Sequence, residues 1–288
     1  MKIVVASGKG GTGKTTVAVN LALSLSECTL VDCDVEEPNC SLFLPINLKK
    51  IEDVVTRTPK FNLSKCTYCG QCADFCEFHA IAVIKSKNLL FYENLCHGCG
   101  GCELICPNGA ISEGVRKIGE IHHGTMDNID LFVGKLDVGE PMATPVIKKV
   151  KSFALKESNK PIIFDSPPGV ACPAIEAMRG ADFCILVTEP TPFGLHDLKL
   201  AVGVTKKLGI PCGVIVNREG IGDDRIDRYC AIEKIPILMK IKENREIAEL
   251  YSKGIPFTSK LLEYRRMFLN LYKSIDKMIS DSKRVDKS

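Results

Sequence analysis

The chain has 288 residues, of which 45% are hydrophobic and 25% charged, with a formal net charge of +3. This composition predicts a globular protein with one sizeable core and a small additional unit, and it gives no indication of a nucleic-acid surface. No apolar run approaches the roughly 18 residues of a membrane span and no signal peptide is evident, so we expect a cytoplasmic protein without membrane attachment. The 15 cysteines, an odd number, exclude a complete disulfide framework and favour metal ligands.

Apolar strand-like segments alternate with helical segments along most of the chain. Because the strands are nearly continuous in apolar residues, they predict a buried, mostly parallel sheet flanked by helices, an α/β fold with right-handed crossover connections. The expected strands are 2–7, 29–34, 130–134, 161–166, 183–190, 212–217 and 236–241. The expected helices are 14–26, 144–157, 194–208, 243–252 and 260–281.

This alternation is interrupted between about Pro59 and Gly114, where cysteine, glycine and short strands replace the long helical periods. We therefore expect a discontinuous domain formed by residues 1–58 and 115–288, with an inserted domain over residues 59–114. The insert contains an internal repeat, because its first four cysteines recur thirty residues later. The two sets are Cys66, Cys69, Cys72 and Cys76, and Cys96, Cys99, Cys102 and Cys106.

The first expected strand is followed by GKGGTGKT, which fits the phosphate-loop pattern G-x-x-x-x-G-K-[ST] and precedes an expected helix. Glycines let backbone N–H groups surround the phosphates, and the helix N-terminus adds positive partial charge. Lys14 is expected to reach the β- and γ-phosphates, and the Thr15 hydroxyl to coordinate Mg²⁺. The residues expected to bind ATP here are Gly8, Lys9, Gly10, Gly11, Thr12, Gly13, Lys14, Thr15 and Thr16.

The additional lysine of this loop, Lys9, makes KGGTGKT the deviant Walker A signature. In this signature the chain resembles the MinD/ParA/Mrp superfamily, which also includes the nitrogenase iron protein. The resemblance implies a nucleotide-sandwich dimer, either of identical chains or with a paralogous ATPase, in which Lys9 crosses to the partner's phosphates. Lys9 would then be catalytic together with Lys14, because a cation supplied in trans stabilises charge that develops on the transferring phosphoryl group. The alternative is a surface lysine beside a mobile loop.

Three further segments resemble that superfamily. In VDCDVEEPN, Asp34 matches the residue that orients the attacking water, and it is expected to be catalytic, whereas Asp32 is a candidate for the Mg²⁺ site. In IIFDSPPG, Asp165 matches the Walker B aspartate, which holds Mg²⁺ through water. In VIVNR, Asn217 matches an asparagine that pairs with adenine. For each residue, the alternative is an ordinary cap or turn position.

Both cysteine groups have the spacing C-x2-C-x2-C-x3-C, which is typical of bacterial ferredoxins with two clusters. In that pattern the fourth cysteine of each group ligates the other cluster, so we expect two 4Fe-4S clusters; zinc is the competing metal. One cluster is assigned to Cys66, Cys69, Cys72 and Cys106, and the other to Cys96, Cys99, Cys102 and Cys76. Cys76 is followed by Glu77 where the ferredoxin pattern expects proline, so the second cluster is expected to be lower in potential or more labile.

Cys172 lies seven residues after Asp165, as does a cysteine of the nitrogenase iron protein that helps to hold a cluster between two subunits. It is therefore a candidate ligand for an additional metal or bridging cluster in the dimer. The alternatives are a structural cysteine or an ordinary switch residue.

These features predict an ATPase with an inserted ferredoxin domain. Our first hypothesis is an ATP-gated electron carrier that serves a redox partner through two clusters. The alternative is an assembly ATPase, similar to Mrp, that inserts clusters or metallocofactors into a client metalloprotein. A third hypothesis is a MinD-like positioning switch that uses the amphipathic C-terminal helix at membranes, although core packing is the simpler role for that helix.

Overall fold

A nine-stranded sheet forms the centre of the protein in the computed structural model, which describes residues 1–84 and 87–285. The strand order is β11-β10-β9-β1-β8-β2-β7-β6-β3, and only the pairs β7–β6 and β6–β3 are antiparallel. The strands are β1 (Lys2–Ala6), β2 (Cys28–Asp32), β3 (Lys49–Phe61), β6 (Ile111–Met126), β7 (Ile129–Leu136), β8 (Ile162–Asp165), β9 (Phe183–Thr188), β10 (Cys212–Glu219) and β11 (Ile237–Lys242).

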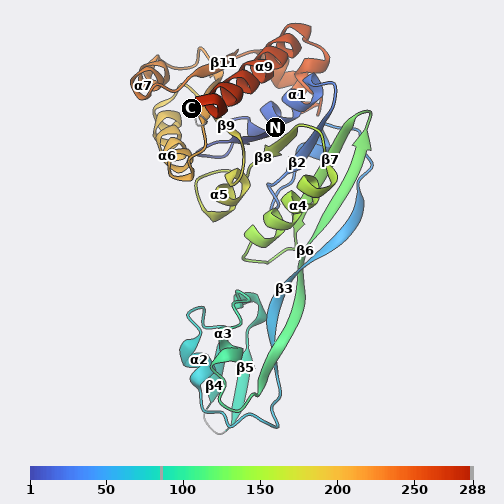
Figure 1. The fold of residues 1–288 in the computed structure, drawn as a ribbon, viewed down its shortest axis with the longest axis vertical. Helices are drawn as coiled ribbons and strands as arrows, with labels where there is room; N and C mark the ends of the chain where they lie inside the picture. The colour runs from blue at the N-terminus through green and yellow to red at the C-terminus, as the bar shows by residue number, and fades with distance from the viewer. Residues whose placement is uncertain (85–86, 286–288) are drawn as a thin grey trace.

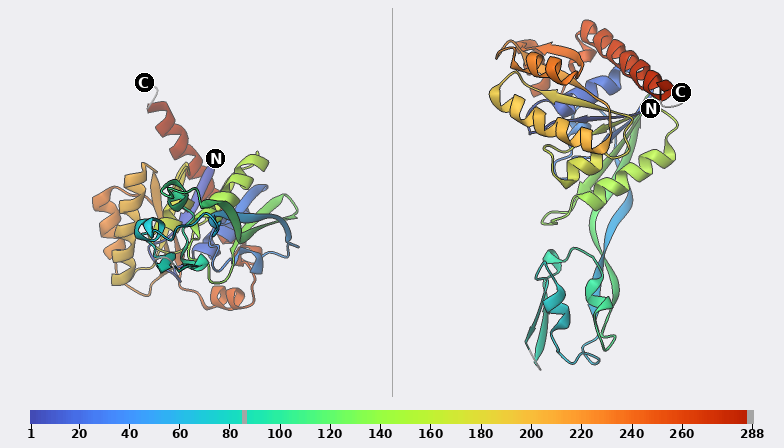
Figure 2. Two further views of the ribbon diagram at one scale, coloured as in Figure 1. Left: turned by 90° about the horizontal axis from the view of Figure 1, so that it is seen from below. Right: turned by 60° about the vertical axis from the view of Figure 1, so that its left-hand side comes forward.

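Helices cover both faces of this sheet (Figures 1 and 2). The apolar cluster on one face joins the sheet to α1 (Lys14–Ser24), α8 (Arg245–Ser252) and α9 (Leu262–Val285), with short turns at η1 (Cys40–Leu42) and η3 (Phe257–Ser259). The cluster on the other face joins it to α4 (Thr144–Glu157), α5 (Cys172–Met178), α6 (Pro192–Leu208) and α7 (Arg225–Glu233). None of the helices in the described part of the chain combines the length and apolar character that crossing a bilayer requires.

Strands β3 and β6 extend beyond the sheet as a twisted two-stranded ribbon that ends in a separate lobe (Figure 1). Residues 111–117 of β6 pair only with β3, because the pairing of β6 with β7 begins at Gly119. We call residues 55–61 and 111–118 the ribbon, residues 62–110 the lobe, and the rest the body. The lobe contains α2 (Gln71–Phe75), β4 (Ile81–Ile84), β5 (Asn88–Phe91), η2 (Glu93–Leu95) and α3 (Gly101–Leu104).

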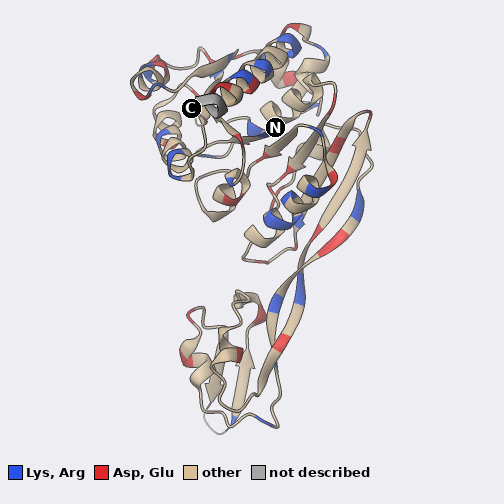
Figure 3. Ribbon diagram, in the orientation of Figure 1, with Lys and Arg blue, Asp and Glu red and all other residues tan. Residues whose placement is uncertain are grey.

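Positively and negatively charged residues are interspersed along the ribbon and the neighbouring sheet edge (Figure 3). Lys50 pairs with Asp53, Lys117 pairs with Asp137, and Arg57 pairs with Glu113. Because β3 is the edge strand of the sheet, these charges and Pro59 discourage its pairing with another chain.

All seven expected strands and all five expected helices are present, with ends shifted by a few residues, and α9 packs into the core through residues such as Phe268. The sequence did not predict α5, α7 or the strands β3 and β6. The expectation of a crossover at every connection is wrong for β6–β7, which is a hairpin closed by Met126 and Ile129. The expected domain boundaries fall opposite each other on the ribbon, where Thr58 pairs with Gly114.

Candidate functional site: a phosphate loop and two thiol-lined cavities

The phosphate loop lies at the carboxyl end of β1, between β8 and β9, and leads into α1. Gly13, at φ +92°, caps α1, and a Cβ there would lie 2.5 Å from the Asn217 side chain. At Gly8 a Cβ would lie 2.1 Å from the Asp197 carbonyl oxygen. The loop therefore needs glycine at both positions for close backbone packing.

A cavity of about 470 Å³ opens over this loop and has the size of a small-molecule site. It brings together most of the residues expected to bind nucleotide with a wall formed by the start of α8. The lining includes Gly10, Gly11, Gly13, Lys14, Thr15, Thr16, Asp34, Asn217, Arg218, Asn244 and Tyr251.

Thr15 and Asp165 meet beneath this cavity as the Mg²⁺ assignment requires. The Thr15 hydroxyl donates a hydrogen bond of 2.6 Å to Asp165 Oδ2, and Asp165 is fully buried. Its other oxygen, Oδ1, has no hydrogen-bond partner among the described residues. Burial raises the pKa of Asp165 to about 6, against the stabilising effects of Thr15 and Lys14. A hydroxyl beside a buried carboxylate with one unpaired oxygen fits a hard divalent cation.

Lys14 and Asp34 also converge on the cavity. Lys14 is 6% exposed, and its burial lowers the pKa of the ammonium group while Asp165 and Asp34 oppose that change. Burial raises the pKa of Asp34 to about 6, and the positive charge of Lys14 partly offsets this. A desolvated cation is stabilised by nearby anions, which here are these two carboxylates, and phosphate oxygens bound in the cavity would add to them.

Asp32 lies beside the Mg²⁺ residues, because single ligand atoms of Asp32, Cys40 and Asp165 all lie within 4.8 Å of one another, and its place in the Mg²⁺ site remains a prediction. Its carboxylate is fully buried and accepts hydrogen bonds from the backbone N–H groups of Cys40 at 2.9 Å and Asp34 at 3.1 Å. Burial, followed by the nearby charge of Asp165, raises the pKa of Asp32 to about 8. Asp32 therefore anchors the segment that presents Asp34.

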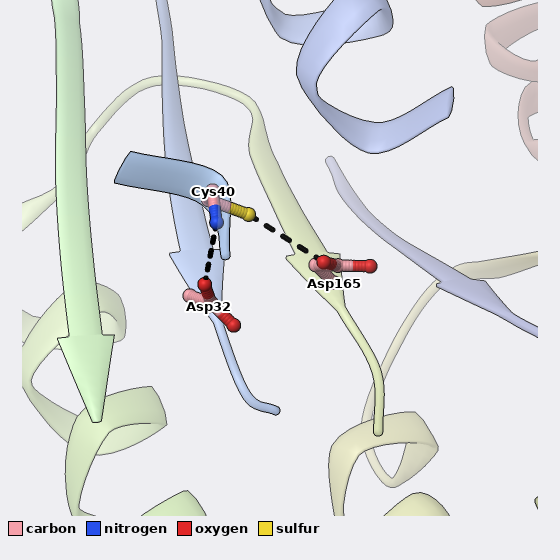
Figure 4. Close-up of side chains that lie close together, drawn as sticks. All are labelled: Asp32, Cys40 and Asp165. Atoms are coloured by element: carbon pink, nitrogen blue, oxygen red, sulfur yellow. Dashed lines mark hydrogen bonds between the residues drawn. The ribbon is translucent and has the colours of Figure 1, made fainter. Parts of the chain in front are cut away.

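The sequence did not single out Cys40, which forms hydrogen bonds with both Asp32 and Asp165 (Figure 4). Its thiol donates to Asp165 Oδ2 at 3.5 Å, and burial raises the pKa of that thiol. The contact joins residues that are far apart in the chain, so no local spacing could have revealed it.

Lys9 does not line the cavity of its own chain in the described structure. Its Nζ lies 3.3 Å from Glu189 Oε2, and Arg218 Nη1 lies 2.9 Å from Glu189 Oε1. Glu189 is only 6% exposed, so two cations share one largely buried carboxylate. The only sequence signal for Glu189 is its place at the carboxyl end of an apolar strand.

Asn217 braces the phosphate loop. Its side-chain amide donates to the Thr12 carbonyl oxygen at 2.9 Å, and its own oxygen accepts from the Arg218 N–H at 3.0 Å. Asn217 still lines the cavity, so its pairing with adenine remains a prediction.

In the lobe, the structure brings the eight cysteines together around two cavities in the combinations expected from the repeat. One cavity is lined by Cys66, Cys69, Cys72 and Cys106. The other is lined by Cys76, Cys96, Cys99 and Cys102. We call these the first and second thiol sites.

Backbone N–H groups point at four of these sulfurs. Tyr68 and Gly98 donate to Cys66 and Cys96 at 3.4 and 3.5 Å. In the same way, Ala80 and Ala110 donate to Cys76 and Cys106 at 3.4 and 3.3 Å. Such hydrogen bonds stabilise metal-bound thiolates, so four thiols and two backbone donors per site fit an iron-sulfur cluster.

Cys172 is the first residue of α5 and is exposed. It lies in the body and lines neither thiol site in the described structure. Its assignment as a ligand in the dimer remains a prediction.

Comparison with known proteins agrees with this geometry. The model of the CobQ/CobB/MinD/ParA nucleotide binding domain matches residues 3–257. An uncharacterized protein of Methanocaldococcus jannaschii is 34% identical over 261 residues, covering 89% of this chain and 91% of that protein. An iron-sulfur cluster carrier protein of Pyrococcus horikoshii is 25% identical over 277 residues, covering 88% of this chain and 78% of its own.

Among solved structures, the septum site-determining protein MinD from Pyrococcus horikoshii, complexed with Mg-ADP, superimposes with a TM-score of 0.58. It is 25% identical, and the match covers 96% of both chains. The phosphate loop, the Thr15–Asp165 contact and the matched family model agree, and this chain belongs to the CobQ/CobB/MinD/ParA nucleotide-binding domain family.

Proposed function

We propose that the protein is a dimeric, Mg-ATP-dependent ATPase that carries two 4Fe-4S clusters in its lobe and uses ATP to control cluster delivery to a client metalloprotein. The observation that carries this proposal is that one chain holds a cavity over a phosphate loop and two cavities that each meet four thiols. The likeness to an iron-sulfur cluster carrier protein over 88% of the chain supports delivery ahead of electron transfer.

In the nucleotide cavity, Lys14 and the backbone of the phosphate loop would bind the phosphates, while Thr15 and Asp165 would hold Mg²⁺. Bound Mg²⁺ neutralises charge on the phosphate oxygens. Asp34 lines the same cavity and would orient the attacking water, because its segment is anchored through the hydrogen bonds to Asp32. Asn217 would contact the base while it braces Thr12.

Lys9 would act on the partner chain's phosphates. Its contact with Glu189 supports this, because Lys9 pairs with that residue and does not line the cavity of its own chain. When Lys9 leaves, Arg218 still pairs with Glu189, so the buried carboxylate retains a counter-charge. Moving Lys9 from Glu189 to the partner's phosphates therefore avoids the several kcal/mol that an unpaired buried charge would cost. Lys9 is thus free to change partners when the dimer forms.

A second candidate is ATP-gated electron transfer, our first hypothesis from the sequence. It is favoured by the arrangement of the lobe, in which each group of cysteines contributes one thiol to the other group's site, as in ferredoxins. A membrane-positioning switch is less compatible with the structure, because Phe268, Leu271 and Ile275 of α9 are buried in the core.

Anaerobic assays with an apo-acceptor protein separate these functions. We expect the purified protein to contain iron and sulfide, and ATP to accelerate the transfer of labelled iron to the acceptor. Lys9→Ala should bind ATP without this acceleration. Retention of all iron through many ATP turnovers, together with ATP-dependent re-oxidation of reduced clusters, would favour electron transfer. Material without iron and sulfide would refute both functions.

The same preparations test the additional ligand at Cys172. If Cys172 holds a labile cluster between two chains, Cys172→Ala should lose the iron in excess of the lobe's clusters and keep the lobe's own signal in electron paramagnetic resonance. An iron content and a spectrum equal to those of the wild type would show that Cys172 is structural or an ordinary switch residue.

A further inference from the structure

The two thiol sites arise from the same sequence repeat, but the space around them differs. The second thiol site opens into a cavity of about 440 Å³, whereas the cavity at the first thiol site measures about 20 Å³. The lining of the larger cavity includes the aromatic side chains of Phe75, Phe78, Phe91 and His97. The first site is therefore closely packed, and the second has room beside its thiols.

The contact across each site differs as well. At the first site, Asn108 Nδ2 donates a hydrogen bond of 2.8 Å to Thr67 Oγ1. The positions thirty residues away in the repeat are Phe78 and His97, and at the second site their rings stack with centroids 3.5 Å apart and an interplanar angle of 6°. A directional hydrogen bond at one site is thus replaced by a ring stack at the other.

The surroundings of the ring stack favour separation of the Phe78 and His97 rings. Phe78 is 43% exposed, so water already reaches one side of the pair. It follows Glu77, which also lines the larger cavity, whereas its counterpart Asn108 follows the conformationally fixed Pro107. Separating a stacked pair costs about 0.5–1.5 kcal/mol beyond the area that it buries.

We propose that the second thiol site is the exchange site of the lobe, that the Phe78–His97 pair is its gate, and that the first thiol site keeps its cluster. This inference rests on the proposed function, because it assumes that both sites hold clusters. At the exchange site, an incoming thiol would replace each cysteine on iron. One iron–sulfur bond would form as another breaks, and the proton of the incoming thiol would pass to the released thiolate without any change in oxidation state.

The rate of iron release to a chelator tests the proposed difference between the two thiol sites directly. The anaerobic holoprotein should lose half of its lobe iron in a fast phase and half in a slow phase. Cys99→Ala should alter the rate or amplitude of the fast phase and leave the slow phase intact. Cys69→Ala, its counterpart in the repeat, should alter the slow phase and leave the fast phase intact. A single phase in the wild type, or loss of the fast phase in Cys69→Ala, would overturn the inference.

The gate has its own matched pair of variants, which remains decisive if a cysteine variant loses all its iron. Phe78→Ala should accelerate the fast phase roughly two- to tenfold, as expected for the loss of one ring stack. Asn108→Ala, at the repeat position, should leave the fast phase unchanged. Equal rates of the fast phase in Phe78→Ala and the wild type would contradict the gate. A holoprotein without iron would instead refute the proposed function.

Discussion

The body and the lobe have different sources of stability. In the body, two apolar clusters lie on either side of the sheet, and the largest fully buried side chains, such as Phe164, Phe183 and Phe268, all belong to them. In the described part of the lobe and the adjoining end of the ribbon, the apolar cluster contains three buried residues, Cys72, Ile81 and Ile111, and one of these is a cysteine of the first thiol site. The lobe therefore has little apolar area to bury.

This difference indicates what metal binding by the cysteines would do for the fold. A unit of this size rarely gains enough free energy from apolar burial alone to offset its conformational entropy. Metal–thiolate bonds can supply the missing free energy, because the ligands come together only in the folded chain. The body has its own apolar clusters, so we expect metal removal to unfold the lobe and to leave the body folded.

The largest expected effect follows from removing iron. In the iron-free protein we expect the hydrogen-exchange protection of residues 62–84 and 87–110 to fall to the level of an unfolded chain, because the core of the lobe is too small. Protection in α1 and β8 should remain. Exchange measured by mass spectrometry on the apo- and holoprotein gives both values. A lobe that stays protected without iron would show that its apolar core suffices.

The same difference explains which parts of the fold could be predicted from the sequence. Buried strands such as β1 and β8 are continuous apolar runs, and the phosphate loop follows one of them in a recognisable pattern. The repeat also predicted which cysteines meet around each cavity, because both halves have the same spacing. These features are local or periodic, so they are visible without coordinates.

The ribbon could not be predicted in this way. Strand β3 has mostly exposed and half-buried residues, includes Pro59, and resembles a linker in composition. Pro59 is tolerated because β3 is an edge strand, where a missing N–H group costs little. The contacts of Cys40 with Asp165 and of Glu189 with Lys9 join distant segments, so they depend on the finished sheet.

The next effect should appear only in the body. Lys9→Ala should reduce ATP hydrolysis by at least about a hundredfold and abolish ATP-dependent dimerisation, because the trans cation is lost. Nucleotide affinity and the iron content of the lobe should stay unchanged. Turnover assays, sedimentation and iron analysis provide the three measurements. Lys207→Ala, an exposed lysine on α6, is the control. Full turnover by a monomeric Lys9→Ala variant would disprove the role in trans.

A smaller effect concerns the pH dependence of the body. Burial raises the pKa of Asp165 to about 6, so the folded protein favours the protonated form of this carboxyl. The stability that results is fully present below about pH 4 and is lost as the pH rises through 6. Asp165→Asn cannot ionise, and without nucleotide it should be more stable than the wild type by roughly 1–3 kcal/mol at pH 8, with no difference near pH 4. Its ATPase activity should be lost. Denaturant unfolding of the body across this pH range measures the difference, and a gap that does not vary with pH would rule out this cause.

The smallest effect should appear at the junction of the two regions. Arg116, on the ribbon, pairs with Glu140 of the body, and its Nη2 donates to the Cys96 carbonyl oxygen at 3.4 Å. The two paired side chains are only 9% and 12% exposed, so Glu140→Gln leaves a buried guanidinium without its counter-charge.

We expect Glu140→Gln to accelerate hydrogen exchange severalfold at residues 115–118 and around Cys96, without changing the iron content. The matched control is Glu113→Gln, which breaks the more exposed pair with Arg57 on the same ribbon and should have little effect, because solvent screens exposed charges. If the two variants exchange equally, the Arg116–Glu140 pair does not fix the second thiol site to the body. If only Glu140→Gln accelerates hydrogen exchange in the ribbon, the Arg116–Glu140 pair is a contact through which the body holds the lobe in position.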